Sequence, residues 1–145
     1  MGNYNYKLQT VLDFKSSIQD QMMLKYSNAK KELENSEKRL NEFLEDKRKI
    51  ENEKDDLNYI KTIKDLKNYN SYIEQSNYKI NNQKKMINEV KKEVNEAKDN
   101  LITASKDKKV FEKLKENDYK KHLNLMKKKE SITVDEIVTF ISCNN

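Results

Sequence analysis

An apolar residue recurs every three, then every four, positions along the second half of this chain. The positions are Leu66, Tyr69, Ile73, Ser76, Ile80, Gln83, Ile87, Val90, Val94, Ala97, Leu101 and Ala104, of which all but Ser76 and Gln83 are aliphatic residues, Ala or Tyr. This spacing places them on one side of an α-helix, in the a and d positions of a heptad repeat. Such a stripe is stable in water when a second helix covers it. The pattern therefore predicts a coiled-coil seam and demands a partner helix.

The composition agrees with long helices. The chain has no proline, and its one glycine is Gly2. Proline breaks a helix interior and glycine weakens one, so nothing beyond residue 2 interrupts a helix. Charged residues make up 38% and hydrophobic residues 34%, too polar for an ordinary compact core and too periodic for disorder. We therefore expect an all-α, elongated domain.

A first helix is predicted from about residue 6 to about residue 57, with its own stripe. Its members are Leu8, Leu12, Ile18, Met22, Tyr26, Ala29, Leu33, Ser36, Leu40, Phe43, Ile50 and Leu57. Residues 58–70 break the register. A chain reversal at about residues 58–65 would make the first helix the partner of a second helix over about 66–130. The predicted fold is an antiparallel coiled-coil hairpin over residues 1–130, with an overhanging C-terminal end.

The hairpin makes a prediction about register. Facing positions should sum to about 123 in the antiparallel seam. Apolar residues then face each other in six pairs: Ile50 with Ile73, Phe43 with Ile80, Leu33 with Val90, Ala29 with Val94, Met22 with Leu101, and Leu12 with Phe111. The alternative has no turn and pairs two chains side by side. We expect the monomeric hairpin.

The last forty residues differ from the rest in charge and in the pairing of their apolar residues. Residues 106–130 contain ten lysines and five acids, a net charge of +5. After them Ile137, Val138, Phe140 and Ile141 have no evident partner in the hairpin. Residues 131–145 are expected to form a separate tail, either a short helix or a disordered segment.

The chain lacks the usual constellations of catalysis. His122 is the single histidine and Cys143 the single cysteine, and neither stands in a metal-binding spacing. One glycine excludes a glycine-rich phosphate loop. We expect no enzyme activity, no cofactor and no metal. Phe111 and Tyr119 are too few to stack nucleic-acid bases, so no nucleic-acid partner is expected. No stretch approaches the roughly 20 apolar residues of a membrane span.

Tyrosines gather around the predicted turn: Tyr59, Tyr69, Tyr72 and Tyr78. Exposed aromatic side chains are enriched in protein contact sites because they bury much area at small entropic cost. The other interpretation is that Tyr59 and Tyr69 cover the end of the coil. Both remain open at this point.

Motifs at both ends resemble the flagellar export protein FliJ family. Residues 4–13 read aromatic-x-aromatic followed by Leu-Gln-x-Val-Leu-Asp. Residues 110–116, followed by Tyr119, resemble the late motif of the family, and Glu130 with residues 134–137 resembles its Asp-Glu-Ile ending. The resemblance covers essentially the whole chain. Lysines at 106, 108 and 109 stand where the family often has arginine.

The resemblance implies a stalk in the type III flagellar export apparatus. Its partners would be the export ATPase hexamer, the cytoplasmic domain of the export gate and export chaperones, at the cytoplasmic face of the inner membrane. By position, the ATPase ring would meet Leu8, Gln9, Leu12, Phe111, Leu114 and Tyr119. The export gate would meet Tyr69, Tyr72, Ile73 and Ser76. The alternatives are a generic coiled-coil scaffold or tether with a basic end, and a small chaperone that holds export substrates.

Overall fold

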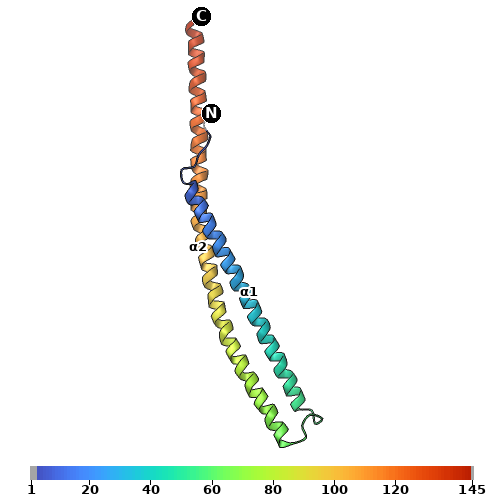
Figure 1. The fold of residues 1–145 in the computed structure, drawn as a ribbon. Coiled ribbons are helices and arrows are strands. Elements are labelled where there is room, and N and C mark those ends of the chain that lie inside the picture. Colours follow the sequence, from blue (N-terminus) through green and yellow to red (C-terminus); the bar gives the residue numbers. More distant parts are fainter. Residues whose placement is uncertain (1–2, 145) are drawn as a thin grey trace. The chain divides into compact units, whose positions relative to one another are not determined.

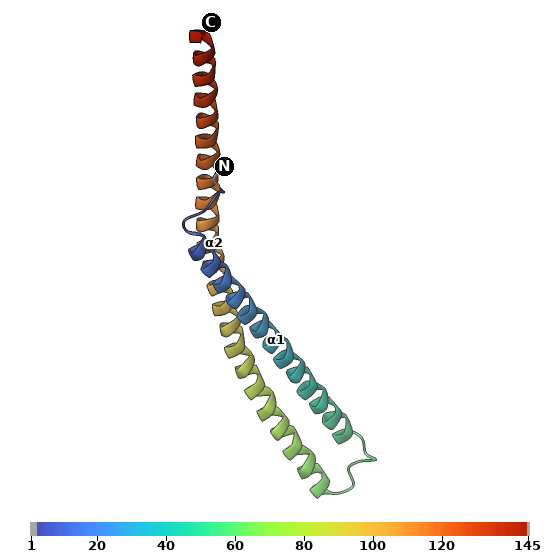
Figure 2. The same ribbon diagram turned by 45° about the horizontal axis from the view of Figure 1, so that its top comes forward.

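The computed structural model describes residues 3–144 as two long helices joined by a short connection (Figure 1). Helix α1 is Gln9–Lys54 and helix α2 is Ile63–Asn144. Between residues 22 and 101 they run antiparallel and side by side in both views (Figures 1 and 2). No strand occurs within residues 3–144. The all-α antiparallel hairpin expected from the heptads is confirmed.

The chain divides into two compact units. The hairpin unit comprises residues 22–101 and contains the turn. The terminal unit comprises residues 1–21 and 102–145. Nothing in the heptad pattern indicates this division, because the a and d positions continue through residue 101 to Ala104.

The core of the hairpin unit is the predicted seam. Ile80, Ile87 and Val90 are buried, with Val90 only 3% exposed. From residue 66 to residue 101, every α2 side chain that is buried or half-buried lies at a predicted a or d position. Leu66 is the one predicted member of this stretch that is exposed. The spacing of apolar residues therefore decides which face of α2 meets α1.

Contacts between the helices confirm the predicted register. Within each unit, the expected sum of facing positions is about 123. The contacts include Tyr69–Glu53, Lys79–Phe43 and Gln83–Ser36 in the hairpin unit, and Ser105–Gln19, Asp107–Lys15, Lys115–Gln9, Phe111–Lys15 and Lys108–Gln19 in the terminal unit. Their positions sum to between 119 and 127, within about one helical turn of the prediction. The first helix is thus the partner that the second helix required.

The turn occupies residues 55–62, about three residues earlier than expected. Thr62 caps α2: its Oγ1 accepts a hydrogen bond from Asp65 N at 3.2 Å, and Asp65 Oδ2 accepts one from Thr62 N at 3.2 Å. This reciprocal pair is a capping box. Asp56 Oδ1 accepts from Asn58 N at 3.0 Å and supports the turn without glycine or proline. Leu57 falls outside α1 and is 88% exposed, so it does not join the seam.

In the terminal unit, the residues before α1 lie against α2. Tyr6 is buried, and its hydroxyl donates to Phe111 O at 3.2 Å. Further along, α2 continues without a break to Asn144, where the sequence analysis expected a separate tail from Ser131. No glycine or proline stands there to end the helix. Residues 131–144 are all exposed.

Candidate functional site

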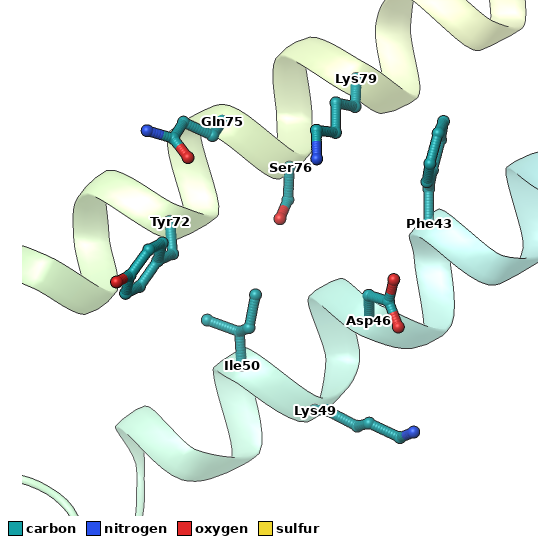
Figure 3. Close-up of a pocket in the computed structure, with 8 residues that line it drawn as sticks. All are labelled: Phe43, Asp46, Lys49, Ile50, Tyr72, Gln75, Ser76 and Lys79. Carbon is teal, nitrogen blue, oxygen red and sulfur yellow. The ribbon is translucent and has the colours of Figure 1, made fainter.

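A groove of about 370 Å³ lies between the two helices of the hairpin unit (Figure 3). Its lining residues are Phe43, Asp46, Lys49 and Ile50 from α1, and Tyr72, Gln75, Ser76 and Lys79 from α2. Ile50 and Ser76 extend toward each other from opposite sides, and Lys49 extends away (Figure 3). The groove is partly open to solvent, so it suits a contact with a protein surface better than an enclosed ligand.

The groove exists because the seam is weak at this point. Ser76 occupies an a/d position that a larger apolar side chain would fill. The register places Lys47 opposite it, and Lys47 Nζ turns to Glu51 Oε1 at 3.6 Å. A small residue facing a charged one cannot close the gap between the helices. The aromatic side chains of Phe43 and Tyr72 line the space that remains.

The groove combines apolar walls with charged edges. Lys79 Nζ stands 6.0 Å from the centroid of the Phe43 ring, within the range of a cation–π interaction. Asp46 and Lys49 supply both signs of charge beside it. Tyr72 is 55% exposed at one end. An exposed aromatic side chain among apolar and charged neighbours is a typical composition for a protein contact.

Tyr69 lies nearer the turn and links the two helices. Its hydroxyl donates to Glu53 Oε2 at 3.3 Å. Partial burial, and then the negative charge of Glu53, raise the pKa of Tyr69 above its ordinary value. This side chain is therefore occupied in holding α2 to the end of α1.

The terminal unit carries an aromatic cluster of Tyr4, Tyr119 and His122. The ring of Tyr4 meets that of Tyr119 edge to face, with centroids 5.0 Å apart, and that of His122 at 5.3 Å. The hydroxyl of Tyr4 donates to Asp118 Oδ2 at 2.9 Å. Partial burial, together with the hydrogen bond and charge of Asp118, raises the pKa of Tyr4 to about 12. The neutral phenol of Tyr4 thus holds the N-terminal segment against α2.

Polar contacts next to this cluster join the start of α1 to α2. Lys115 Nζ donates to Gln9 Oε1 at 2.7 Å, while Gln9 Nε2 donates to Asp13 Oδ1 at 2.8 Å. Lys15 Nζ lies 5.9 Å from the centroid of the Phe111 ring. These contacts position Gln9 and Phe111 between the helices rather than toward solvent.

Metal and membrane chemistry find no support in the described residues. Within residues 3–144, no group of three or more His, Cys, Asp and Glu side chains is placed to hold a metal ion. Across the same residues, neither helix has a stretch long and apolar enough to cross a membrane.

A family model described as "Flagellar FliJ protein" matches residues 4–145. The chain belongs to the FliJ family. The resemblance found at both ends of the sequence is thereby confirmed, and membership of the family gives the chain a role related to flagellar export. Comparisons with curated proteins and with solved structures give no significant match.

The four residues that the sequence assigned to the export gate all lie in the hairpin unit of this FliJ-family chain. Tyr72 and Ser76 line the groove, whereas Tyr69 and Ile73 do not. Tyr69, Ile73 and Ser76 are half-buried in the seam, and Tyr72 is the exposed member. The structure thus makes Tyr72 the side chain of this set that is free to meet another protein.

The six residues assigned to the ATPase ring all lie in the terminal unit. Leu12 is buried and serves the core. Gln9 and Phe111 are half-buried in contacts with the other helix. The three that present exposed surface are Leu8, Leu114 and Tyr119.

The sequence analysis missed several side chains of these surfaces. Asp46, Lys49, Gln75 and Lys79 were not singled out, although the register that pairs Ile50 with Ile73 places them at the edges of the same seam. Tyr4 and Asp118 were also missed as partners. Tyr4 precedes α1 and carries no helical period, so no pattern in the sequence indicated where its ring lies.

Proposed function

We propose that this FliJ-family chain is a non-enzymatic stalk that couples the export ATPase ring to the membrane export gate of the flagellar type III apparatus. The single observation that supports this most is the family match, which spans residues 4–145. We further propose that the chain acts at the cytoplasmic face of the inner membrane, held there by its partners.

The physical argument starts from what the seam leaves free. A coiled coil uses its a and d side chains for its own stability, so binding falls to the side chains outside the seam and at its weak points. The hairpin unit offers the groove beside Tyr72. The terminal unit offers Leu8, Leu114 and Tyr119. Two separate sets of exposed residues on one helical scaffold suit a component that holds two partners.

The first test uses the cognate export ATPase. We expect the full chain to stimulate ATP hydrolysis and to promote ring formation as its concentration rises. Leu114→Ala should weaken the stimulation by about tenfold, as loss of a contact residue does at protein interfaces. Leu44→Ala is the matched control, since Leu44 is similarly exposed but belongs to the hairpin unit. If ATP hydrolysis and ring formation stay unchanged over a wide range of chain concentration, the proposed contact with the ATPase is wrong.

The second test uses the cytoplasmic domain of the export gate. We expect Tyr72→Ala to weaken binding by about tenfold, because Tyr is frequent among the residues that dominate binding energy. Tyr78→Ala is the control: Tyr78 is also exposed but lies outside the groove. Equal losses in both variants would mean that the groove is not the contact, and no loss in either would remove the gate from this surface.

Export chaperones are the third proposed partner. The hollows described in residues 3–144 are partly open to solvent, so we assign chaperone binding to exposed side chains of the coil. Co-sedimentation with purified export chaperones, empty and loaded with substrate, tests this role. Binding of unfolded export substrate without a chaperone would instead favour a substrate-holding function.

A further inference from the structure

The C-terminal part of α2 carries a second heptad stripe that no described segment of the terminal unit covers. The terminal stripe consists of Leu123, Met126, Glu130, Thr133, Ile137 and Phe140, which alternate in spacing between three and four residues. Met126 is half-buried, and the other five are exposed. Within the terminal unit, no other described segment lies beside the last part of the helix (Figures 1 and 2). A stripe at this spacing is the surface that a helix presents to another helix.

The stripe matches itself when it is reversed. In an antiparallel pair of two copies, facing positions that sum to 263 place every member opposite another member. Leu123 then faces Phe140 of the second copy, Met126 faces Ile137, and Glu130 faces Thr133. We propose that two copies of this chain pair antiparallel through the terminal stripe, which adds a dimer interface to the hairpin.

Charge at the edge of the stripe favours the same arrangement. Lys129 and Glu136 lie seven residues apart on one edge, each directly before an a position. Antiparallel pairing places Lys129 of one copy beside Glu136 of the other, twice by symmetry. Parallel pairing in register would instead set Glu130 against Glu130 at the centre of the interface. Like charges at that position repel, so the antiparallel arrangement is favoured.

The surface of the stripe has the shape that such packing needs. A hollow of about 410 Å³ is lined by Met126, Lys129, Glu130, Thr133 and Val134. The first four stand at i, i+3, i+4 and i+7, the four positions that form a hole in coiled-coil packing. In the proposed register, Thr133 of the second copy faces this hole. The polar centre has a precedent in the same molecule, where Gln83 and Ser36 are buried within the seam of the hairpin.

The proposed dimer does not require the stalk function, and it departs from the monomer expected from the sequence. The hairpin still closes within one chain, because α1 covers the seam up to Ala104. Pairing concerns α2 from Leu123 onward. It would cover the apolar end of the free chain with a second copy.

Sedimentation equilibrium of the full chain between about 1 μM and about 1 mM tests the pairing. We expect a reversible monomer–dimer equilibrium in this range. Ile137→Lys should weaken dimerisation at least about tenfold, as a charge in an apolar contact does. Ile132→Lys is the matched control, because Ile132 is about equally exposed (56% against 52%) and lies on another side of the helix. A chain that stays monomeric up to about 1 mM, or equal effects of both variants, would overturn the proposal.

Cross-linking decides the orientation. In a Cys143→Ser background, Leu123→Cys and Phe140→Cys chains should form disulfide-linked heterodimers when mixed, and neither should link efficiently to itself. In the antiparallel register, the two copies of residue 123 are separated by 17 residues of helix, roughly 25 Å. Self-linked Phe140→Cys dimers would indicate parallel pairing and overturn the register.

Exchanging the charges of Lys129 and Glu136 provides a third test of the pairing. Lys129→Glu should weaken dimerisation several-fold, and the double variant with Glu136→Lys should restore it, since each copy then again offers opposite charges. Failure of the double variant to recover would contradict the charge pairing. If the full chain is monomeric and Ile137→Lys instead abolishes binding to the export ATPase, the stripe belongs to that partner and the self-pairing is wrong.

Discussion

One helix, α2, contains both a stretch that is buried against a partner and a stretch that is exposed throughout. Around Val90 its apolar stripe meets α1 and is buried. From residue 131 to residue 144 an apolar pattern of similar density meets no described neighbour within its unit. The helix is continuous in both places, so helix propensity does not distinguish them. What differs is the partner, which means that the same kind of sequence stabilises the fold in one stretch and offers a surface in the other.

The largest expected effect compares two valines of α2. Val90→Asp should lower the free energy of unfolding by about 3 kcal/mol, because the variant places an unpaired charge in the seam. Val138→Asp should change it by less than about 0.5 kcal/mol, because Val138 is 55% exposed. Urea denaturation followed by circular dichroism, at low chain concentration, measures both.

Equal losses of unfolding free energy in the two valine variants would contradict the difference between the covered and the exposed stretch of α2. A large loss at Val138 would mean that the end of α2 is covered in solution even at low concentration. A negligible loss at Val90 would mean that the seam does not stabilise the hairpin.

The next effect concerns the buried polar position of the seam. Gln83 Nε2 donates to Ser36 O at 2.9 Å, and both side chains are buried. Gln83→Ala should destabilise the hairpin by about 1–2 kcal/mol, through the lost hydrogen bond and the lost packing of its stem. Gln75→Ala, at an exposed position, is the control and should be nearly silent. If Gln83→Ala instead raised the free energy of unfolding, the amide would contribute to the register of the helices and not to their stability.

A smaller effect is expected where the N-terminal segment meets α2. Tyr6→Phe removes the hydrogen bond to Phe111 O but keeps the buried ring. We expect a loss of about 1 kcal/mol in the free energy of unfolding, the usual net contribution of such a bond. Thermal unfolding of the variant beside the wild type measures it. No change would mean that the segment is held by the ring alone.

Tyr4 provides a pH dependence in the same unit. Its pKa is raised to about 12, so the unfolded chain loses the phenol proton first. The stabilisation is complete below pH 10 and declines as the pH rises from about 10 towards about 12. Tyr69, whose pKa is also raised, changes in the same direction. Tyr4→Phe should flatten the alkaline decline relative to wild type in urea titrations at several pH values, and an unchanged profile would contradict the Tyr4–Asp118 contact.

The seam and its register could be predicted because heptad spacing acts through the whole length of a helix. The turn was placed about three residues late, since its signals are local: the Asp56–Asn58 contact and the capping box of Thr62 and Asp65. The end of α2 was read from a change in composition at Ser131, where nothing in fact interrupts the helix. A change in composition can indicate that residues leave the seam, but it does not by itself end a helix.

The candidate surfaces were predictable only in part. Tyr72 and Ser76 follow from their position beside the turn and in the seam. The aromatic cluster does not, because the ring of Tyr4 reaches Tyr119 from a segment without helical period. The exposed or buried state of Leu12, Phe111 and Leu114 depends on packing that a motif does not specify. Contact residues in a coiled coil therefore need the structure to separate binding side chains from supporting ones.

The central claim is that a single chain supplies both sides of the seam, while the end of α2 has no partner among the described residues of its own unit. Hydrogen–deuterium exchange of the full chain, read by mass spectrometry over a dilution series, tests it most directly. We predict slow exchange across residues 80–104 at every concentration and fast exchange across residues 131–144 in the most dilute sample. Loss of protection across residues 80–104 on dilution would contradict the claim, because the seam would then depend on a second chain.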